Sequence, residues 1–156
     1  MARNKFRASY STLSGWLSGD YDRAIKQYFK LEDFDTPAMK RGREYHEAWD
    51  SEIRQTNSMP KVFGGQGLVD PQTELKIERE LDEWLDLVGV IDLYEDRTIY
   101  DWKTGKTPAQ SINPYRVYTY QILLPQAVRA EIHRHDPDTM TTDMVIYHLT
   151  EKTLDQ

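Results

Sequence analysis

The chain has no cysteine among its 156 residues. This absence excludes a disulfide framework, a thiol nucleophile and an iron–sulfur cluster held by cysteines. No apolar run approaches the length of a membrane span, and Met1 to Lys5 lead into no signal-peptide core. We therefore expect a soluble cytoplasmic protein with no membrane partner, folded as a single domain over residues 1–156.

The chain also lacks an excess of positive charge. Its formal net charge of −6 argues against a generally basic surface that coats nucleic acid. A local anion-binding site stays compatible with this charge, because a metal ion and a few placed Lys or Arg residues can outweigh the distant field. Aromatic residues make up 12% of the chain, and some of these rings could stack on bases or sugars, although most should pack in the core.

The segment from Val88 to Gly105 has the pattern of a β-hairpin. Both arms are rich in β-branched, aliphatic and aromatic residues, and a polar stretch separates them. A two-residue loop at Asp96 and Arg97 would place Asp92 directly opposite Asp101. The segment therefore predicts two carboxylates that face each other across neighbouring strands.

Side chains alternate along a strand, so Asp92, Asp101 and Lys103 share one face of this hairpin. The other face carries an expected core set: Ile91, Leu93, Tyr100 and Trp102. Facing carboxylates repel unless a cation lies between them or one is protonated. Hard carboxylate oxygens suit Mg²⁺ or Mn²⁺, and Lys103 could reach an anionic substrate or its attacking water. The alternative is an exposed face with solvated charges.

Before the hairpin we expect helices and one strand. Ser9 or Ser11 should cap a first helix, or hold a phosphate at its N-terminus, and residues 21–31 form a second short helix. A helix over about 38–53 carries one face of Met39, Gly42, Tyr45, His46 and Trp49. Glycine in mid-helix costs about 1 kcal/mol, so Gly42 should permit a close approach. His46 alone fits a core histidine better than a metal ligand.

Residues 57–71 are expected to form a long loop with a functional role, and residues 73–81 a strand with one wet face. Glu74 or Glu78 on that face has the parity to join a metal site. Asn113 and Pro114 should start a last helix that runs to about His133 and is kinked at Pro125. Its end would be a solvated cluster rather than a second metal site: Glu131, His133, His135 and Asp136. Residues 144–149 form a final strand.

Several of these features occur in the order found in one nuclease family: Ser9-Tyr10-Ser11, Pro37 followed by Gly42 and His46, Gly89-Val90-Ile91-Asp92, Asp101-Trp102-Lys103-Thr104-Gly105, and Gln121. On these motifs the chain resembles the RecB-like branch of the PD-(D/E)XK nuclease superfamily, which includes CRISPR-adaptation exonucleases and many phage nucleases. The resemblance covers nearly the whole length. It implies an α/β fold with a restriction-endonuclease-like core, in which a central mixed β-sheet of the three middle strands and the last one is flanked by helices.

The resemblance implies a nuclease, exo- or endonucleolytic, that hydrolyses phosphodiester bonds with Mg²⁺ or Mn²⁺. DNA is favoured over RNA, and a helicase, recombination, CRISPR or phage protein is the kind of partner it implies. The metal ligands it implies are His46, Asp92, Asp101 and the backbone carbonyl of Trp102. Lys103 would position or activate water and stabilise the pentacovalent phosphate. Gln121 would orient that lysine or a substrate phosphate, and Glu74 is favoured over Glu78 as an additional acid.

The chain departs from the family at Pro125, where relatives often have a tyrosine, and in the absence of the four cysteines that bind an iron–sulfur cluster in many of them. The candidate substrate contacts are Ser9, Ser11, Arg41, Arg43, Lys106, Arg116 and Tyr118. Two alternatives stay open: a catalytically silent nucleic-acid-binding or assembly module, and a hydrolase of small phosphoesters. A groove lined by basic residues would favour a polynucleotide, whereas a closed pocket would favour a small substrate.

Overall fold

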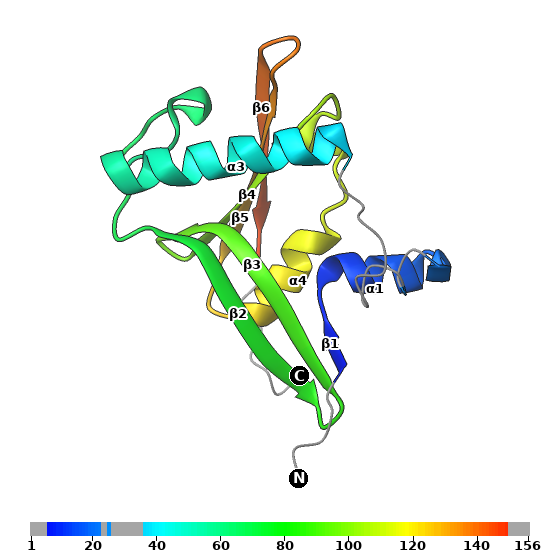
Figure 1. The fold of residues 1–156 in the computed structure, drawn as a ribbon. Coiled ribbons are helices and arrows are strands. Elements are labelled where there is room, and N and C mark those ends of the chain that lie inside the picture. Colours follow the sequence, from blue (N-terminus) through cyan, green and yellow to red (C-terminus); the bar gives the residue numbers. More distant parts are fainter. Residues whose placement is uncertain (1–5, 23–24, 26–35, 150–156) are drawn as a thin grey trace.

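The computed structural model describes residues 6–22, 25 and 36–149 (Figure 1). The elements in order are β1 (Phe6–Ala8), α1 (Tyr10–Leu17), α3 (Pro37–Thr56), the 3₁₀ helix η1 (Lys61–Phe63), β2 (Gln72–Asp82), β3 (Leu85–Glu95), β4 (Thr98–Thr104), the 3₁₀ helix η2 (Ala109–Ser111), α4 (Tyr115–Leu123), β5 (Arg129–Asp136) and β6 (Thr141–His148). Most of the second helix expected at residues 21–31 lies outside the described residues.

The six strands form one mixed sheet in the order β1-β3-β4-β5-β6, with β2 paired to β3 beside this path. β1 runs parallel to β3 and β4 runs parallel to β5, whereas the other pairs are antiparallel. The expected α/β class with a central mixed sheet flanked by helices is thus confirmed. β1 and β5 are strands that the sequence pattern did not predict.

Helices α3 and α4 cover opposite faces of β4 (Figure 1). Tyr100 and Trp102 point to the α3 side, where they pack with its Trp49 and Ile53. Ile99 points the other way, into the cluster that contains the apolar residues of α4, as strand alternation requires. Each face of the central strand therefore has its own core.

The turn between β3 and β4 fixes their register. Asp96 and Arg97 both have positive φ angles, of 47° and 58°, which is the backbone of a two-residue hairpin turn. Three residue pairs follow from it: Glu95 with Thr98, Tyr94 with Ile99, and Leu93 with Tyr100. The predicted register is confirmed over these pairs.

Beyond Leu93 and Tyr100 the two strands separate. The Trp102 N–H donates to Asp92 Oδ2 at 2.8 Å, so a side chain replaces the next step of the backbone ladder. The prediction that Ile91 shares a core with Leu93 was wrong, because Ile91 packs in the α4 cluster. The physical reason is this separation, after which β3 continues beside β2 and no longer follows β4.

The predicted long helix to His133 was wrong. α4 ends at Leu123, and Leu124 leaves helical geometry with φ −125° and ψ 77°, because a residue before proline is sterically kept out of the helical region. Residues 129–136 form β5, which pairs with β4 and β6. The expected solvated helix end is therefore a buried part of the sheet: Glu131, His133, His135 and Asp136.

The charged residues of β5 are buried with partners. Glu131 Oε1 lies 2.9 Å from His133 Nε2, and Glu131 Oε2 lies 3.0 Å from Arg129 Nε. His135 Nδ1 lies 3.0 Å from Thr142 Oγ1. Because burying a charge without a partner is costly, these pairs allow so polar a strand to occupy an interior position.

The segment from 57 to 71 is more ordered than the expected loop. It contains η1 and a bridge between Ser58 and Gly67, and it buries Met59, Phe63 and Leu68 against α3 and the sheet. None of the helices in the described part is long and apolar enough to cross a membrane.

Candidate functional site

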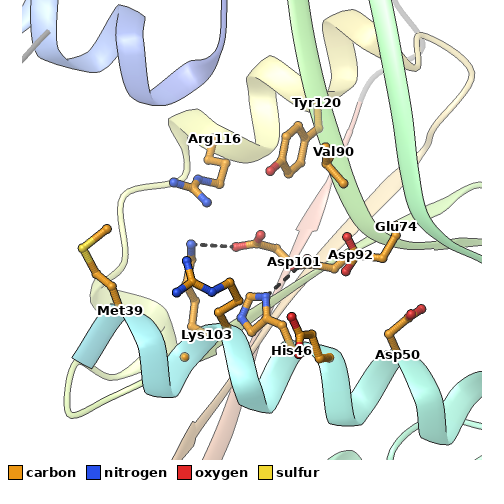
Figure 2. Close-up of a pocket in the computed structure, with 13 residues that line it drawn as sticks. Met39, His46, Asp50, Glu74, Val90, Asp92, Asp101, Lys103, Arg116 and Tyr120 are labelled. Atoms are coloured by element: carbon orange, nitrogen blue, oxygen red, sulfur yellow. Dashed lines mark ion pairs between the residues drawn. The ribbon is translucent and has the colours of Figure 1, made fainter. Parts of the chain in front are cut away.

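A pocket of about 800 Å³ lies at the separation of β3 and β4, between α3 and α4 (Figure 2). Residues from five elements line it: Met39, Gly42, Arg43, His46, Glu47, Asp50, Glu74, Val90, Asp92, Asp101, Lys103, Arg116 and Tyr120. The sequence-predicted His46, Asp92, Asp101 and Lys103 thus meet in one open cavity. Of the predicted cationic contacts, Arg43 and Arg116 join them.

Asp101 is the most enclosed acid of this pocket, with 2% of its surface exposed. Its Oδ2 pairs with Lys103 Nζ at 3.3 Å, and no other donor among the described residues reaches this oxygen (Figure 2). Burial raises the pKa of Asp101, the charge of Lys103 opposes that rise, and the charge of Asp92 adds to it. The site therefore holds a buried carboxylate oxygen with unfilled acceptor capacity.

His46 reaches the same acids from α3. Its Nδ1 lies 3.5 Å from Asp92 Oδ1 (Figure 2). Burial lowers the pKa of His46, but the hydrogen bond to Asp92 and the charges of Asp92 and Asp101 together outweigh burial, so the net shift is upward. Gly42, one turn earlier, allows this approach: a methyl group there would lie 3.0 Å from Thr104 Oγ1, which confirms the expected close contact at this glycine.

Capping residues fix where helix α3, which carries His46, begins and ends. Thr36 accepts a hydrogen bond from the Met39 N–H, Pro37 follows as the first helical residue, and Asn57 ends the helix with a left-handed φ of 54°. His46 lies between these caps. Asp50, one turn after it, also lines the pocket, and its spacing of four residues is a signal that the sequence reasoning missed.

Glu74 extends the row of acids onto β2. It lies opposite Asp92 between the pairs Thr73–Leu93 and Leu75–Ile91, and its φ of 48° interrupts the regular strand. Burial raises the pKa of Glu74, and the charges of Asp92 and Asp50 raise it further. Glu78 lies elsewhere, because its carboxylate pairs with Arg7 at 3.0 Å.

Helix α4 contributes Arg116 and Tyr120, one turn apart, and not Gln121. Gln121 is buried at 6% exposure but does not line the pocket. Tyr120 was absent from the sequence-based candidates, although its spacing of four residues from Arg116 could have indicated it. Tyr118 is 43% exposed and packs against the rings of Tyr115 and Tyr147 outside the pocket.

The other predicted contacts lie around the pocket rather than in it. Arg41 pairs with Asp138 at 3.0 Å, and together with Lys106 it lines a neighbouring hollow of about 240 Å³. Ser9 caps α1 by accepting a hydrogen bond from the Thr12 N–H at 3.4 Å, which confirms the capping prediction. Ser11 lies in the first turn of α1 and is not among the lining residues.

The donors of the pocket are of the type that Mg²⁺ or Mn²⁺ accepts, namely carboxylate oxygens and one imidazole nitrogen. Within residues 6–22, 25 and 36–149 no three His, Asp or Glu side chains already form a group that could hold an ion. The arrangement instead consists of two ion pairs, His46 with Asp92 and Lys103 with Asp101. The buried Asp101 oxygen, which has only Lys103 as a partner among the described residues, is the observation that fits an added cation.

Comparisons with known proteins give a fold and no family. No family model and no curated protein matches the sequence. The structure titled "Crystal structure of SSO0001" matches with a TM-score of 0.59 and 14% identity over 97% of this chain and 72% of that chain. An alkaline exonuclease (LHK-Exo) from Laribacter hongkongensis gives 0.47 and 14% over 86% and 70%. The first likeness shows a shared fold, and the second is too loose to add to it.

Proposed function

We propose that this protein is a metal-dependent nuclease that hydrolyses phosphodiester bonds of DNA. One observation carries the proposal: the buried Asp101 carboxylate, whose Oδ2 has only the Lys103 ammonium at 3.3 Å as a partner among the described residues, lies in an open pocket with Asp92 and His46. Two acids, an imidazole and an ammonium in one cavity are what metal-assisted phosphoryl chemistry requires. The resemblance of the motifs to RecB-like PD-(D/E)XK nucleases supports the same reaction.

In this mechanism the oxygen of water forms a bond to phosphorus, the bond from phosphorus to the leaving ester oxygen breaks, and a proton passes from the water to the leaving group or to solvent. His46, Asp92, Asp101 and the Trp102 carbonyl would hold Mg²⁺ or Mn²⁺. The ion supplies Lewis acidity and lowers the pKa of water. Lys103 orients the water or the phosphate by hydrogen bonding and neutralises charge that grows on the phosphoryl oxygens.

The surroundings of the pocket favour a polynucleotide over a small phosphoester. Arg43 and Arg116 line the pocket itself, and the hollow with Arg41 and Lys106 adjoins the same end of α3. A further hollow of about 450 Å³ shares Val90 with the pocket. These neighbouring hollows give a chain of phosphates room to continue beyond the pocket, whereas a closed cavity would not.

The direct test is cleavage of labelled single- and double-stranded DNA and RNA with Mg²⁺, Mn²⁺ or chelator. We expect metal-dependent cleavage of DNA. Lys103→Met should lower the rate by about a hundredfold, because a preorganised charge near the reacting phosphate is lost. Lys40→Met is the matched control, since Lys40 is exposed on α3 and does not line the pocket.

The outcomes separate the alternatives. Binding of DNA without cleavage under any metal would support the silent module and contradict the proposal. Cleavage restricted to nucleotides or other small esters would support the small-substrate hydrolase. If Lys103→Met and Lys40→Met cleave DNA equally well, this pocket is not the site of the reaction.

The raised pKa of His46 predicts a pH dependence of metal affinity. A histidine ligand must be neutral, so Mn²⁺ affinity should fall by up to about tenfold per pH unit below that pKa. The fall should begin at a higher pH than for a free histidine, because Asp92 favours the charged ring. Titration calorimetry with Mn²⁺ between about pH 6 and 8.5 measures it.

His46→Asn should bind Mn²⁺ more weakly and with a flatter pH profile, whereas His148→Asn on the exposed face of β6 should keep the profile of the intact protein. In metal-free protein the pH dependence of folding stability has the opposite sign to the pH dependence of Mn²⁺ affinity. The His46–Asp92 pair contributes fully below the unfolded pKa of histidine and is lost as the pH rises through the raised folded value. An unchanged profile in His46→Asn would remove His46 from the metal site.

A further inference from the structure

Arg116 brings a half-buried guanidinium into the pocket from α4 (Figure 2). The guanidinium carbon lies 5.2 Å from the centroid of the Tyr10 ring, above its face. A hydrogen bond also links it to the phenol of Tyr120. Within the described part of the chain, no acid lies within ion-pair distance of this guanidinium.

Within residues 6–22, 25 and 36–149, these contacts occupy only part of its hydrogen-bonding capacity. A guanidinium has five N–H donors in one plane, and the Tyr120 phenol accepts from only part of them. The contact with Tyr10 is a cation–π contact with the ring. In the described structure none of its nitrogens is both buried and without a partner, so solvent reaches the remaining donors, and an anionic ligand in the pocket could replace that water. Tyr10 and Tyr120 contact the Arg116 guanidinium but leave donors free for a further acceptor.

Lys103 extends into the same part of the pocket from β4 (Figure 2). Its ammonium pairs on one side with Asp101, at 3.3 Å. The labelled side chains in Figure 2 show Arg116 and Lys103 pointing toward the same space, with Asp101 beside them. A planar fork and a compact ammonium together suit a tetrahedral group with several anionic oxygens.

We propose that Arg116 and Lys103 together bind the phosphoryl group of the bond that is cut, and that Tyr10 and Tyr120 are positioning residues that orient the Arg116 guanidinium. This inference rests on the proposed nuclease function for the identity of the substrate, but the anion site itself does not require turnover. It also gives α1 a role in the site, since Tyr10 is its first residue.

The first test measures anion binding without metal. Thermal shift of the full chain in chelator is followed with increasing inorganic phosphate, against sodium chloride at matched ionic strength. Phosphate should stabilise the intact protein, and Arg116→Gln should weaken its apparent affinity by about tenfold or more, because a bidentate charged contact is lost. Arg116→Lys should retain part of it. Arg7→Gln, at an exposed arginine that does not line this pocket, should behave as the intact protein.

The second test separates binding from orientation in DNA cleavage. Arg116→Gln should lower kcat by about a hundredfold, as expected for a lost contact to developing charge, and Arg116→Lys should recover part of the rate. Tyr120→Phe should lower kcat by a smaller factor and leave KM nearly unchanged, because it loosens the guanidinium without removing it. Tyr115→Phe is the control, since this tyrosine of α4 is 64% exposed and does not line the pocket.

The two measurements fail in different ways. If phosphate stabilises the protein in a way that depends on Arg116, but the protein cuts no DNA, the proposed anion site stands and the proposed nuclease function is refuted. Cleavage of DNA by Arg116→Gln at the intact rate would refute this inference and leave the nuclease standing. The inference is also refuted if phosphate gives the intact protein no protection, or protects Arg116→Gln equally. A merely structural counter-charge to Asp101 would lower the melting temperature of Arg116→Gln and leave phosphate binding unchanged.

Discussion

Asp101→Asn is expected to reduce DNA cleavage by about a thousandfold, because a metal ion at a reacting phosphate supplies several kcal/mol of charge stabilisation and each 1.4 kcal/mol is worth about tenfold in rate. Asparagine keeps the size of the side chain but not its charge. The loss should persist at saturating DNA, since the missing interaction belongs to the reaction rather than to binding. Single-turnover cleavage with Mg²⁺ or Mn²⁺ measures it.

The same variant should be more stable than the intact protein in chelator at neutral pH. Burial raises the pKa of Asp101 in the folded state, so the stability of the protein falls as the pH rises from the ordinary pKa of an aspartate to the raised folded value. Asparagine resembles the protonated form and removes this loss. The difference in melting temperature should therefore shrink as the pH is lowered toward about 4, the ordinary value for an aspartate.

Asp70→Asn is the matched control for both measurements. Asp70 is exposed between η1 and β2 and has a φ of 47°, a backbone conformation that asparagine also accepts readily. It should change neither cleavage nor the melting temperature in chelator at neutral pH. A destabilised Asp101→Asn at neutral pH, with cleavage retained, would show that the carboxylate has a structural role and that the reaction occurs elsewhere.

Trp102→Ala is expected to lower the free energy of unfolding by about 3–5 kcal/mol, the usual cost of removing a large buried aromatic side chain. The Trp102 ring is 1% exposed. It stacks on Phe63 with centroids 5.1 Å apart and planes 13° apart, and it meets Trp49 edge-on at 6.4 Å. A loss of that size should lower the melting temperature by roughly 10 °C in a protein of this length.

Chemical denaturation with urea measures this loss, with Trp84→Ala as the control. Trp84 lies at the turn between β2 and β3 and is 61% exposed, so its removal should change stability little. Trp102→Phe should recover much of the loss because a ring still fills the space. Equal stability of the two alanine variants would contradict the position of Trp102 in the core beneath α3.

The local features of the hairpin were predictable because they depend on neighbouring residues alone. Asp96 and Arg97 set a two-residue turn, and the turn sets the register of the residues on both sides. The strand at 73–81 was predictable from its alternation. The separation of the strands at Asp92 was not predictable, since it depends on a hydrogen bond from the Trp102 N–H to a side chain on the other strand.

β5 was missed because it does not look like a strand with one wet face. Both faces are covered by neighbouring elements, and its charged residues, including Glu131 and His133, are satisfied by one another inside the protein. Apolar residues continue at helical spacing past Pro125, and the sequence pattern therefore predicted a helix where the structure has β5. The steric effect of proline on the residue before it was the local signal that should have ended the helix.

The sequence motif pointed to Gln121 of α4 as a site residue, whereas the structure places its neighbour Tyr120 in the pocket. Adjacent residues of a helix point about 100° apart, so the rotation of α4 about its axis decides which of them faces the pocket. That rotation is set by the burial of Val117, Leu123 and their neighbours against the sheet, a sum over many contacts. The sequence motif identified the helix, and only its packing placed Tyr120 at the site.

The sequence by itself determined that Asp92, Asp101 and Lys103 share one face of the hairpin, because strand alternation and turn geometry are local properties. It did not determine that the strands part before Asp92 and Asp101 can pair. Only the tertiary structure decided that His46 and Arg116 join them. These residues come from helices on opposite faces of the sheet, and their approach depends on how two separate cores are buried. A contact between distant segments is fixed by the total burial of the chain, which no single stretch of sequence contains.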